Sequence, residues 1–337
     1  MPKERLVVIC PGRGSYTRES SGYLKSYKNI ANEEISWMNN QRKALNLPTL
    51  NDLDSNTFKS KTHMIGVNAS PLIYACSYVD FLSIDKSKYE IVAITGNSMG
   101  WYTTLGLSGV LTFENAFKLI NTMSSLTKDN NGGQIIYPIV NQNWQIDESI
   151  FQMIIKEVED AGAYISIKLG GYIVIAGGQD SLKKLLIKLP INDNYPFQLP
   201  YHSAYHSSIM SSVPEKAFDL LPESLFFKPN IHIIDGRGHI WSPYSTNISE
   251  LYSYTLDNQV TKTYDFNSTI NVAIKEFSPD KLILLGPGNT LGGPVAQILI
   301  QNSWLKIDSK KAFKNIQKND PYLISMSINE QRKIVSK

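Results

Sequence analysis

The stretch Gly96–Gly100 (GNSMG) has a strand-like segment before it and a helix-like segment after it. Residues 89–95 (YEIVAIT) are apolar and β-branched, as in a buried strand, and residues 101–107 (WYTTLGL) read as the opening of a helix. A G-x-S-x-G motif between strand and helix predicts a nucleophile elbow, because its glycines permit a sharp turn that exposes the serine hydroxyl. Ser98 is therefore the candidate nucleophile, and the N–H of Met99 a candidate oxyanion donor. The alternative is a glycine-rich turn with an incidental serine.

The composition is that of a globular chain. Its 337 residues are 42% hydrophobic and 19% charged, enough for a sizeable core in one or two domains. Apolar runs are strand-sized, the first residues do not resemble a signal peptide, and the cysteines are Cys10 and Cys76 alone. We therefore expect a cytoplasmic protein with no membrane span, disulfide framework or metal site. The net charge of +3 excludes the strongly basic surface that nucleic-acid binding requires.

Strand-like and helix-like segments alternate, which predicts an α/β sheet with helices on both faces. Thr112 is the expected N-cap of one of these helices. The predicted strands are 6–10, 89–95, 134–140, 164–169, 172–176, 231–234 and 281–285. The predicted helices are 64–81, 111–126, 148–161, 180–189, 207–221, 267–276 and a last one after Gly288.

A polar break at 128–133 (KDNNGG) indicates a domain boundary. Beyond it, the order strand, helix, two strands joined at Gly170–Gly171, and helix predicts a small β-α-β-β-α subdomain. The predicted division is a discontinuous α/β catalytic domain at 1–130 and 201–310, a subdomain at 131–200, and a C-terminal basic tail at 311–337. Such a tail is either solvated surface or a means of attracting an acidic partner protein.

A serine nucleophile needs a base, and the chain has five histidines. Two of them, His202 and His206, lie in the segment 199–210 (LPYHSAYHSSIM). His206 falls at the start of an apparent helix, where its ring can point into a cleft. Spacing alone does not separate the two, and a structural histidine is the commoner case.

The motifs together resemble the malonyl-CoA:acyl-carrier-protein transacylases and the acyltransferase domains of polyketide synthases. The resemblance selects His206 as the base and implies a hydrolase-like α/β domain with an inserted small ferredoxin-like α+β subdomain. Four segments carry the resemblance. Pro11–Ser15 (PGRGS) is similar to the family's PGQGS loop, and GNSMG is similar to its GHSxG elbow. His206–Met210 is similar to its His-Ser/Cys-x-x-Met segment, and Gly286–Gly288 is similar to its C-terminal Gly-Pro-Gly turn.

The resemblance also implies roles around the nucleophile. The backbone N–H groups of Arg13 and Met99 would hold the oxyanion, and a backbone carbonyl would orient His206. The segment 263–266 (TYDF) looks like the one that supplies this carbonyl, which places Asp265 behind His206. The alternative for Asp265 is a plain helix-start residue. An α/β-hydrolase would differ, because its triad runs serine, acid, histidine.

The acyl-binding residues depart from the family pattern. Met123 falls where the malonyl enzymes have an arginine that pairs with the malonyl carboxylate, and a methionine cannot do so. Arg13 replaces a glutamine in the loop facing the nucleophile; it either restores that charge or is a hydrated surface residue. Tyr205, before His206, is similar to the malonyl-type rather than the methylmalonyl-type version. Arg13, Met123 and Tyr205 are thus the acyl-binding candidates, with malonyl expected and a neutral acyl group as the alternative.

The implied reaction is acyl transfer from a CoA thioester to the phosphopantetheine thiol of an acyl carrier protein, through a Ser98 ester. It would serve fatty acid or polyketide biosynthesis, with acyl-CoA as substrate and no bound cofactor or metal. A serine acyl hydrolase or thioesterase would use the same residues, and a docking subunit without turnover is the non-enzymatic alternative. Arg237 and His239, in a glycine-rich loop, either contact the phosphates of CoA or belong to a structural loop, which we favour.

Overall fold

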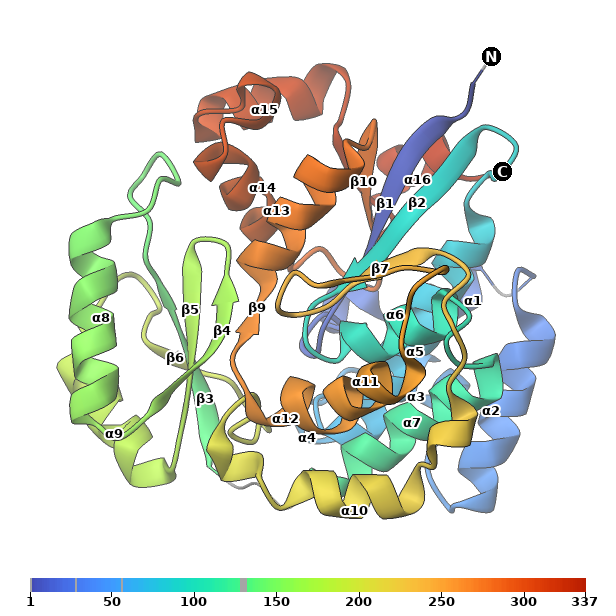
Figure 1. Ribbon diagram of the computed structural model, residues 1–337, viewed down its shortest axis with the longest axis horizontal. Coiled ribbons are helices and arrows are strands. Elements are labelled where there is room, and N and C mark those ends of the chain that lie inside the picture. Colours follow the sequence, from blue (N-terminus) through green and yellow to red (C-terminus); the bar gives the residue numbers. More distant parts are fainter. Residues whose placement is uncertain (1, 28, 56, 128–131) are drawn as a thin grey trace.

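The computed structural model describes the whole chain except residues 1, 28, 56 and 128–131, so the predicted boundary at 128–133 lies mostly outside the described residues. Its main sheet has the strand order β11-β10-β1-β2-β7-β8, and Figure 1 labels its four central strands, β10, β1, β2 and β7. Every pair in it is parallel except β7 with β8. The strands are β1 (Glu4–Cys10), β2 (Tyr89–Gly96), β7 (His232–Ile234), β8 (Ile240–Trp241), β10 (Lys281–Leu284) and β11 (Leu323–Ser325).

Helices cover both faces of this sheet. Residues Leu6–Cys10 of β1 are all fully buried. Successive side chains of a strand point to opposite faces, so neither face at β1 is open to solvent. Helix α6 (Gly100–Leu107) packs on β1 and β2, and α13 (Phe266–Phe277) packs on β2 and β7. The predicted α/β architecture is confirmed.

Two long helices support α6. They are α5 (Gly66–Ser83) and α7 (Phe113–Leu126), which pack against α6 and against each other. Thr112 caps α7 as predicted, because its hydroxyl accepts a hydrogen bond from the N–H of Asn115 at 3.2 Å. The predicted helix 207–221 is instead a 3₁₀ turn at Ser208–Met210 followed by α10 (Val213–Leu220), since Pro214 starts a new helix in its first turn.

A second sheet has the strand order β6-β3-β5-β4-β9 and stands to one side of the main body (Figure 1). Its chain order is β3 (Gly133–Pro138), α8 (Glu148–Asp160), β4 (Tyr164–Leu169), β5 (Tyr172–Gly177), α9 (Gln179–Lys188) and β6 (Phe197–Gln198). The predicted hairpin at Gly170–Gly171 is confirmed. The helices bury Ile154 and Leu182 in a small core of their own with the sheet. The short strand β9 (Tyr264–Asp265) pairs with β4 and connects this sheet to the main body.

Most of the remaining helices were not predicted from the sequence; the exception is α14 (Gly292–Gln301), the helix expected after Gly288. No helix among the described residues has both the length and the apolar character needed to cross a bilayer. The remaining helices are α1 (Tyr23–Ser26), α2 (Asn32–Ala44), α3 (Leu50–Ser55), α4 (Ser60–His63), α11 (Ile248–Ser253), α12 (Gln259–Thr261), α14 (Gly292–Gln301), α15 (Lys310–Asn319) and α16 (Asn329–Val335).

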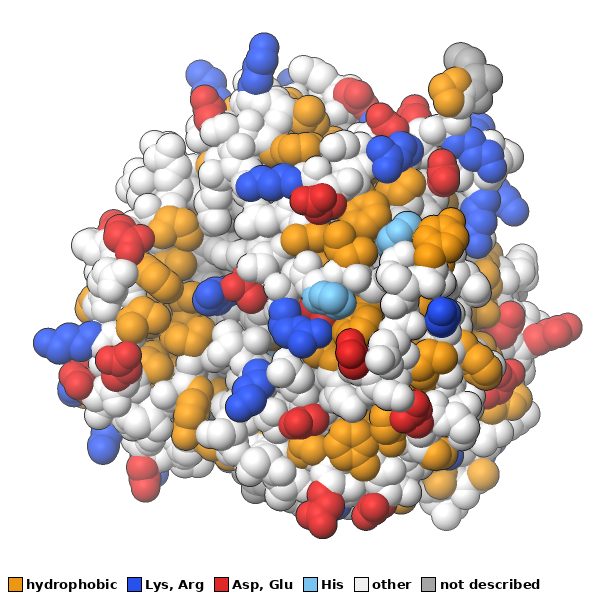
Figure 2. Space-filling view, viewed as in Figure 1, with side chains coloured by type: hydrophobic (Ala, Val, Ile, Leu, Met, Phe, Trp, Pro, Cys, Tyr) orange, Lys and Arg blue, Asp and Glu red, His pale blue; other side chains and the backbone are white. Residues whose placement is uncertain are grey.

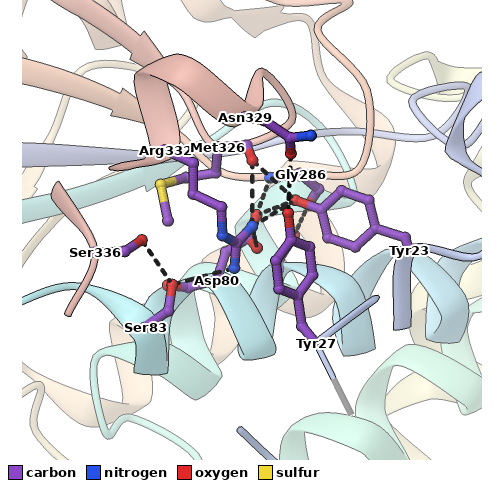
Figure 3. Close-up of polar contacts among 10 residues, drawn as sticks. Tyr23, Tyr27, Asp80, Ser83, Gly286, Met326, Asn329, Arg332 and Ser336 are labelled. Carbon is purple, nitrogen blue, oxygen red and sulfur yellow. Dashed lines mark hydrogen bonds and ion pairs between the residues drawn. The ribbon is translucent and has the colours of Figure 1, made fainter. Parts of the chain in front are cut away.

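The prediction that 311–337 is a basic tail is wrong, because this segment is built into the body. β11 is the edge strand of the main sheet, and α16 buries Arg332 against Asp80 of α5 (Figure 3). The Arg332 Nη1 to Asp80 Oδ1 distance is 2.5 Å, and Asp80 Oδ2 accepts the N–H of Gly286 at 2.6 Å and the hydroxyl of Tyr23 at 2.7 Å. The prediction rested on the excess of positive charge in this segment and overlooked the largely apolar run 322–326 (YLISM), whose residues are fully or nearly buried.

The Asp80–Arg332 pair predicts a large effect of one substitution on stability. Arg332→Met should lower the free energy of unfolding by about 3–5 kcal/mol, because it leaves the Asp80 carboxylate buried and unpaired. The measurement is urea unfolding followed by circular dichroism. Lys333→Met, which removes an exposed i,i+3 pair with Glu330, is the control and should cost less than about 1 kcal/mol. Equal midpoints for the two variants would contradict this account of the C-terminal helix.

Candidate active site

Ser98 lies in a tight turn between β2 and α6. Its φ is 53°, in the left-handed region that non-glycine residues seldom occupy. The flanking glycines are required by contact: a Cβ atom on Gly96 would overlap the backbone of Gly100, and one on Gly100 would overlap the carbonyl of Cys10. The turn therefore has the geometry of a nucleophile elbow, with the serine at the N-terminus of α6.

His206 lies against the Ser98 hydroxyl. Its Nε2 is 2.7 Å from Ser98 Oγ, and its Nδ1 is 2.6 Å from the carbonyl oxygen of Gln259. A carbonyl can only accept, so Nδ1 carries the proton and Nε2 is left to accept the serine O–H. Burial lowers the pKa of His206 to about 4, which keeps the ring neutral and able to act as a base near pH 7.

His202, the other candidate base, is turned to a different partner. Its Nδ1 is 2.8 Å from Oε1 of Gln134, on β3 of the smaller sheet. Burial, then the positive charge of Arg13 and the neighbouring His206, hold the pKa of His202 well below its usual value. The structure thus places His206, and not His202, on the serine.

Gln259 is a site residue that the sequence analysis missed. Besides its carbonyl bond to His206, its side-chain Nε2 donates to the backbone oxygen of Ser98 at 3.1 Å, and its Oε1 accepts the Tyr102 hydroxyl at 2.8 Å. It follows a π-helical turn at Tyr254–Asn258, a kind of distortion often found at functional sites. No motif marks this position, because any residue type can offer a carbonyl.

The predicted place of Asp265 behind His206 is wrong. The orienting carbonyl comes from Gln259, whereas Tyr264 and Asp265 form β9, which pairs with β4. The Asp265 carboxylate caps α13 through the N–H of Ser268 at 2.9 Å and pairs with Lys168 Nζ at 2.9 Å. The alternative of a helix-start residue is the one observed.

Two backbone N–H groups are free near Ser98. Within the part of the chain that the structure describes, neither the N–H of Met99 nor that of Arg13 donates to a protein acceptor. The loop Pro11–Ser15 lies against the elbow, so that a Cβ atom on Gly12 would come within 2.8 Å of the Asn97 carbonyl oxygen. Free N–H groups in a loop and at a helix N-terminus are donors of the kind that can stabilise an oxyanion.

A narrow pocket of about 50 Å³ opens beside the serine and histidine. It brings together all three acyl-binding candidates, Arg13, Met123 and Tyr205. Among the lining residues that the structure describes, Arg13 alone is charged, since His206 is neutral. The other lining residues are Ser70, Ser98, Met99, Tyr102, Ser124, Thr127, Gln259 and Val260.

The Arg13 guanidinium is half-buried and held by neutral oxygens. Its Nη1 donates to the Tyr205 hydroxyl, and its Nη2 donates to the carbonyl oxygens of Met64 at 2.9 Å and Tyr201 at 2.8 Å. Its Nε is buried without a partner. No carboxylate of the described residues pairs with it, so its charge remains available to an anion in the pocket.

The contacts within the glycine-rich loop at 235–241 agree with the structural loop that we favour. The Arg237 guanidinium pairs with the fully buried Asp235 at 2.6 Å and lies 4.2 Å from the ring of Tyr254. Its charge is therefore already neutralised within the loop. The face shown in Figure 2 carries Lys and Arg interspersed with Asp and Glu, as the small net charge leads us to expect.

No protein-family model matches the sequence, and no curated protein does. Solved structures do match. A malonyl-CoA:ACP transacylase from Synechocystis sp. PCC 6803 has a TM-score of 0.75 at 16% identity, over 98% of this chain and 100% of that one. The malonyl-CoA–acyl carrier protein transacylase of Coxiella burnetii has a TM-score of 0.76 at 15% identity, over 98% of this chain and 96% of that one. A malonyl-transacylase in complex with a type II PKS acyl-carrier protein has a TM-score of 0.73 at 17% identity, over 98% of each chain.

At these identities the likeness shows the fold. The chain has the fold of the malonyl-CoA:ACP transacylases over nearly its whole length, which confirms the predicted resemblance at that level. The site geometry comes from this chain alone.

The contact between Ser98 and His206 predicts a reactive serine. A fluorophosphonate probe should form one covalent adduct, seen by intact mass, that is absent in Ser98→Ala. His206→Ala should slow labelling by about 10²–10⁴-fold, the usual contribution of a general base. His202→Ala should have a much smaller effect, because His202 does not contact the serine. The reverse ranking would show that the wrong histidine has been assigned.

Proposed function

We propose that this chain is an acyl-CoA:acyl-carrier-protein S-acyltransferase that moves malonyl from CoA to the phosphopantetheine thiol of a carrier protein. The observation that carries the proposal is the Ser98–His206 pair at a pocket whose one charged lining residue, Arg13, lacks an anionic partner among the described residues. The likeness to transacylase structures supports it, one of them solved with a carrier protein. CoA thioester and carrier protein are the partners, and this chemistry needs no bound cofactor.

The reaction would take place in two half-reactions. Ser98 Oγ attacks the thioester carbonyl while His206 Nε2 takes its proton, and the N–H groups of Met99 and Arg13 hold the oxyanion. His206 then gives the proton to the departing CoA thiolate, which leaves a Ser98 ester. In the second half, His206 takes a proton from the phosphopantetheine thiol, whose sulfur attacks the ester, and the proton returns to Ser98.

Arg13 would hold the malonyl carboxylate. Met123 of α7 forms an apolar wall, so the positive charge would come instead from Arg13, in the loop after β1. Ser70 and Ser124 line the same pocket, and their hydroxyls would add donors for an anion, whereas the Thr127 hydroxyl already donates to the Met123 carbonyl at 2.9 Å. A neutral acyl group is the alternative that Met123 favours, and the Arg13 variant below distinguishes the two.

The finer division of the fold is part of the proposal. Residues 1–130 and 201–310 would form a hydrolase-like catalytic domain, and 131–200 a ferredoxin-like subdomain. The chain order β3-α8-β4-β5-α9-β6 and the strand order β6-β3-β5-β4 support the subdomain assignment. We place the protein in the cytoplasm, in fatty acid or polyketide biosynthesis.

Intact-mass analysis after mixing with malonyl-CoA tests the reaction. The wild type should gain the mass of one malonyl group, and Ser98→Ala should gain none. An adduct that persists in Ser98→Ala, or no adduct with any acyl-CoA of a panel, would overturn the proposal. A thioesterase would instead show release of free acid without transfer to holo carrier protein.

The role of Arg13 is tested by comparing two substrates. Arg13→Gln should weaken malonyl transfer by about 2–4 kcal/mol, the scale for breaking a buried charge pair. Acetyl transfer should be nearly unchanged, because acetyl has no carboxylate. Arg18→Gln, at an exposed position, is the control and should affect neither substrate. Equal losses for malonyl and acetyl would show that Arg13 only shapes the oxyanion loop and that the pocket takes a neutral chain.

A further inference from the structure

The peptide that joins Tyr205 to His206 is held from both sides. The His206 N–H donates to the Val260 carbonyl at 3.0 Å. The Tyr205 carbonyl accepts the Ser166 hydroxyl at 2.8 Å, with a longer contact from Gln134 Nε2 at 3.5 Å. The φ of His206 itself is 56°, a left-handed conformation that is unfavourable for a non-glycine residue. Such strain persists only where the surrounding contacts fix it.

A directed chain of hydrogen bonds leads to this peptide from the smaller sheet. His202 Nδ1–H donates to Gln134 Oε1 at 2.8 Å, Gln134 Nε2 donates to Ser166 Oγ at 2.6 Å, and Ser166 donates to the Tyr205 carbonyl. Amide and carbonyl oxygens can only accept, so the direction of every bond is determined. The Ser166 hydroxyl therefore donates to the Tyr205 carbonyl, in the peptide next to the candidate base His206.

Gln134 and Ser166 are buried polar residues that packing alone does not explain. Ser166 is fully buried on β4, and Gln134 is 2% exposed on β3. Polar side chains in such places cost free energy unless they are hydrogen-bonded, and an apolar residue would fill the same volume. Neither residue lines the pocket beside Ser98. What the two residues share is a side-chain hydrogen bond to the carbonyl of the Tyr205–His206 peptide.

We propose that Gln134 and Ser166 are positioning residues for His206. They fix the Tyr205–His206 peptide from the smaller sheet, so that the strained backbone keeps the imidazole on the Ser98 hydroxyl. The smaller sheet thus takes part in organising the candidate catalytic pair as well as in flanking it. This inference rests on the proposed function only in treating His206 as the base.

Ser166→Ala tests the proposal, with Tyr137→Phe as a matched control. Tyr137 lies on β3, the strand that carries Gln134, and donates one hydrogen bond to a backbone carbonyl outside the Tyr205–His206 peptide, that of Pro190 at 2.7 Å. Ser166→Ala should lower the rate constant of acylation at saturating malonyl-CoA by about 10- to 100-fold, the effect of a small misplacement of a catalytic group. The KM should change by less than about 2-fold, because Ser166 does not line the pocket. Tyr137→Phe should change neither constant.

A second variant and a second assay keep the outcome clear. Gln134→Met, which preserves the volume but removes the donor, should reproduce the loss in the acylation rate constant if Ser166→Ala does not fold. The fluorophosphonate labelling rate reports on the same pair without malonyl, so it distinguishes failure of the proposed reaction from failure of the positioning. A folded Ser166→Ala that matches the wild type in both the acylation rate constant and the labelling rate would overturn the proposal, as would an effect confined to KM.

Discussion

The close approach of β1 and β2 at their carboxyl ends is the constraint on which the site depends. Cys10 and Gly96 are register partners, and the Cys10 carbonyl lies so near Gly100 that no side chain fits there. Because the two strands are parallel, the loop Pro11–Ser15 and the elbow leave the same edge of the sheet. The serine, the two free N–H donors and the Arg13 side chain meet at that edge as a consequence. A β-carbon at Gly100 would push α6 away and separate these groups.

Much of this arrangement follows from the sequence, because the signals are local. The elbow needs only two glycines and a serine between a buried strand and a helix, and the cap of α7 needs only Thr112 before an amphipathic run. The choice of His206 over His202 came from family resemblance. It agrees with the geometry, although the spacing of the residues did not require it.

The rest could not be predicted, because it depends on backbone groups and on contacts distant in sequence. No sequence motif identifies the Gln259 carbonyl, and its position depends on a π-helical turn. The sequence therefore predicted, wrongly, that Asp265 lies behind His206. The neighbours of Arg13 are carbonyls of Met64 and Tyr201, which only the folded chain brings together. The prediction that 311–337 is a basic tail considered only the positive charge of this segment, whereas its buried apolar run at 322–326 builds it into the main body.

In the proposed function, Arg13 would allow a pocket with a methionine wall to bind an anion. Neutral oxygens fix the guanidinium without cancelling its charge, and His202 stays uncharged beside it. Two neighbouring positive charges would otherwise repel each other in a buried site. The most direct test of the account is to isolate the malonylated enzyme and mix it with holo carrier protein. We predict that the Ser98 ester is lost as an equal amount of malonyl appears on the phosphopantetheine thiol, whereas release of malonate to water at the same rate with or without the carrier protein would contradict it.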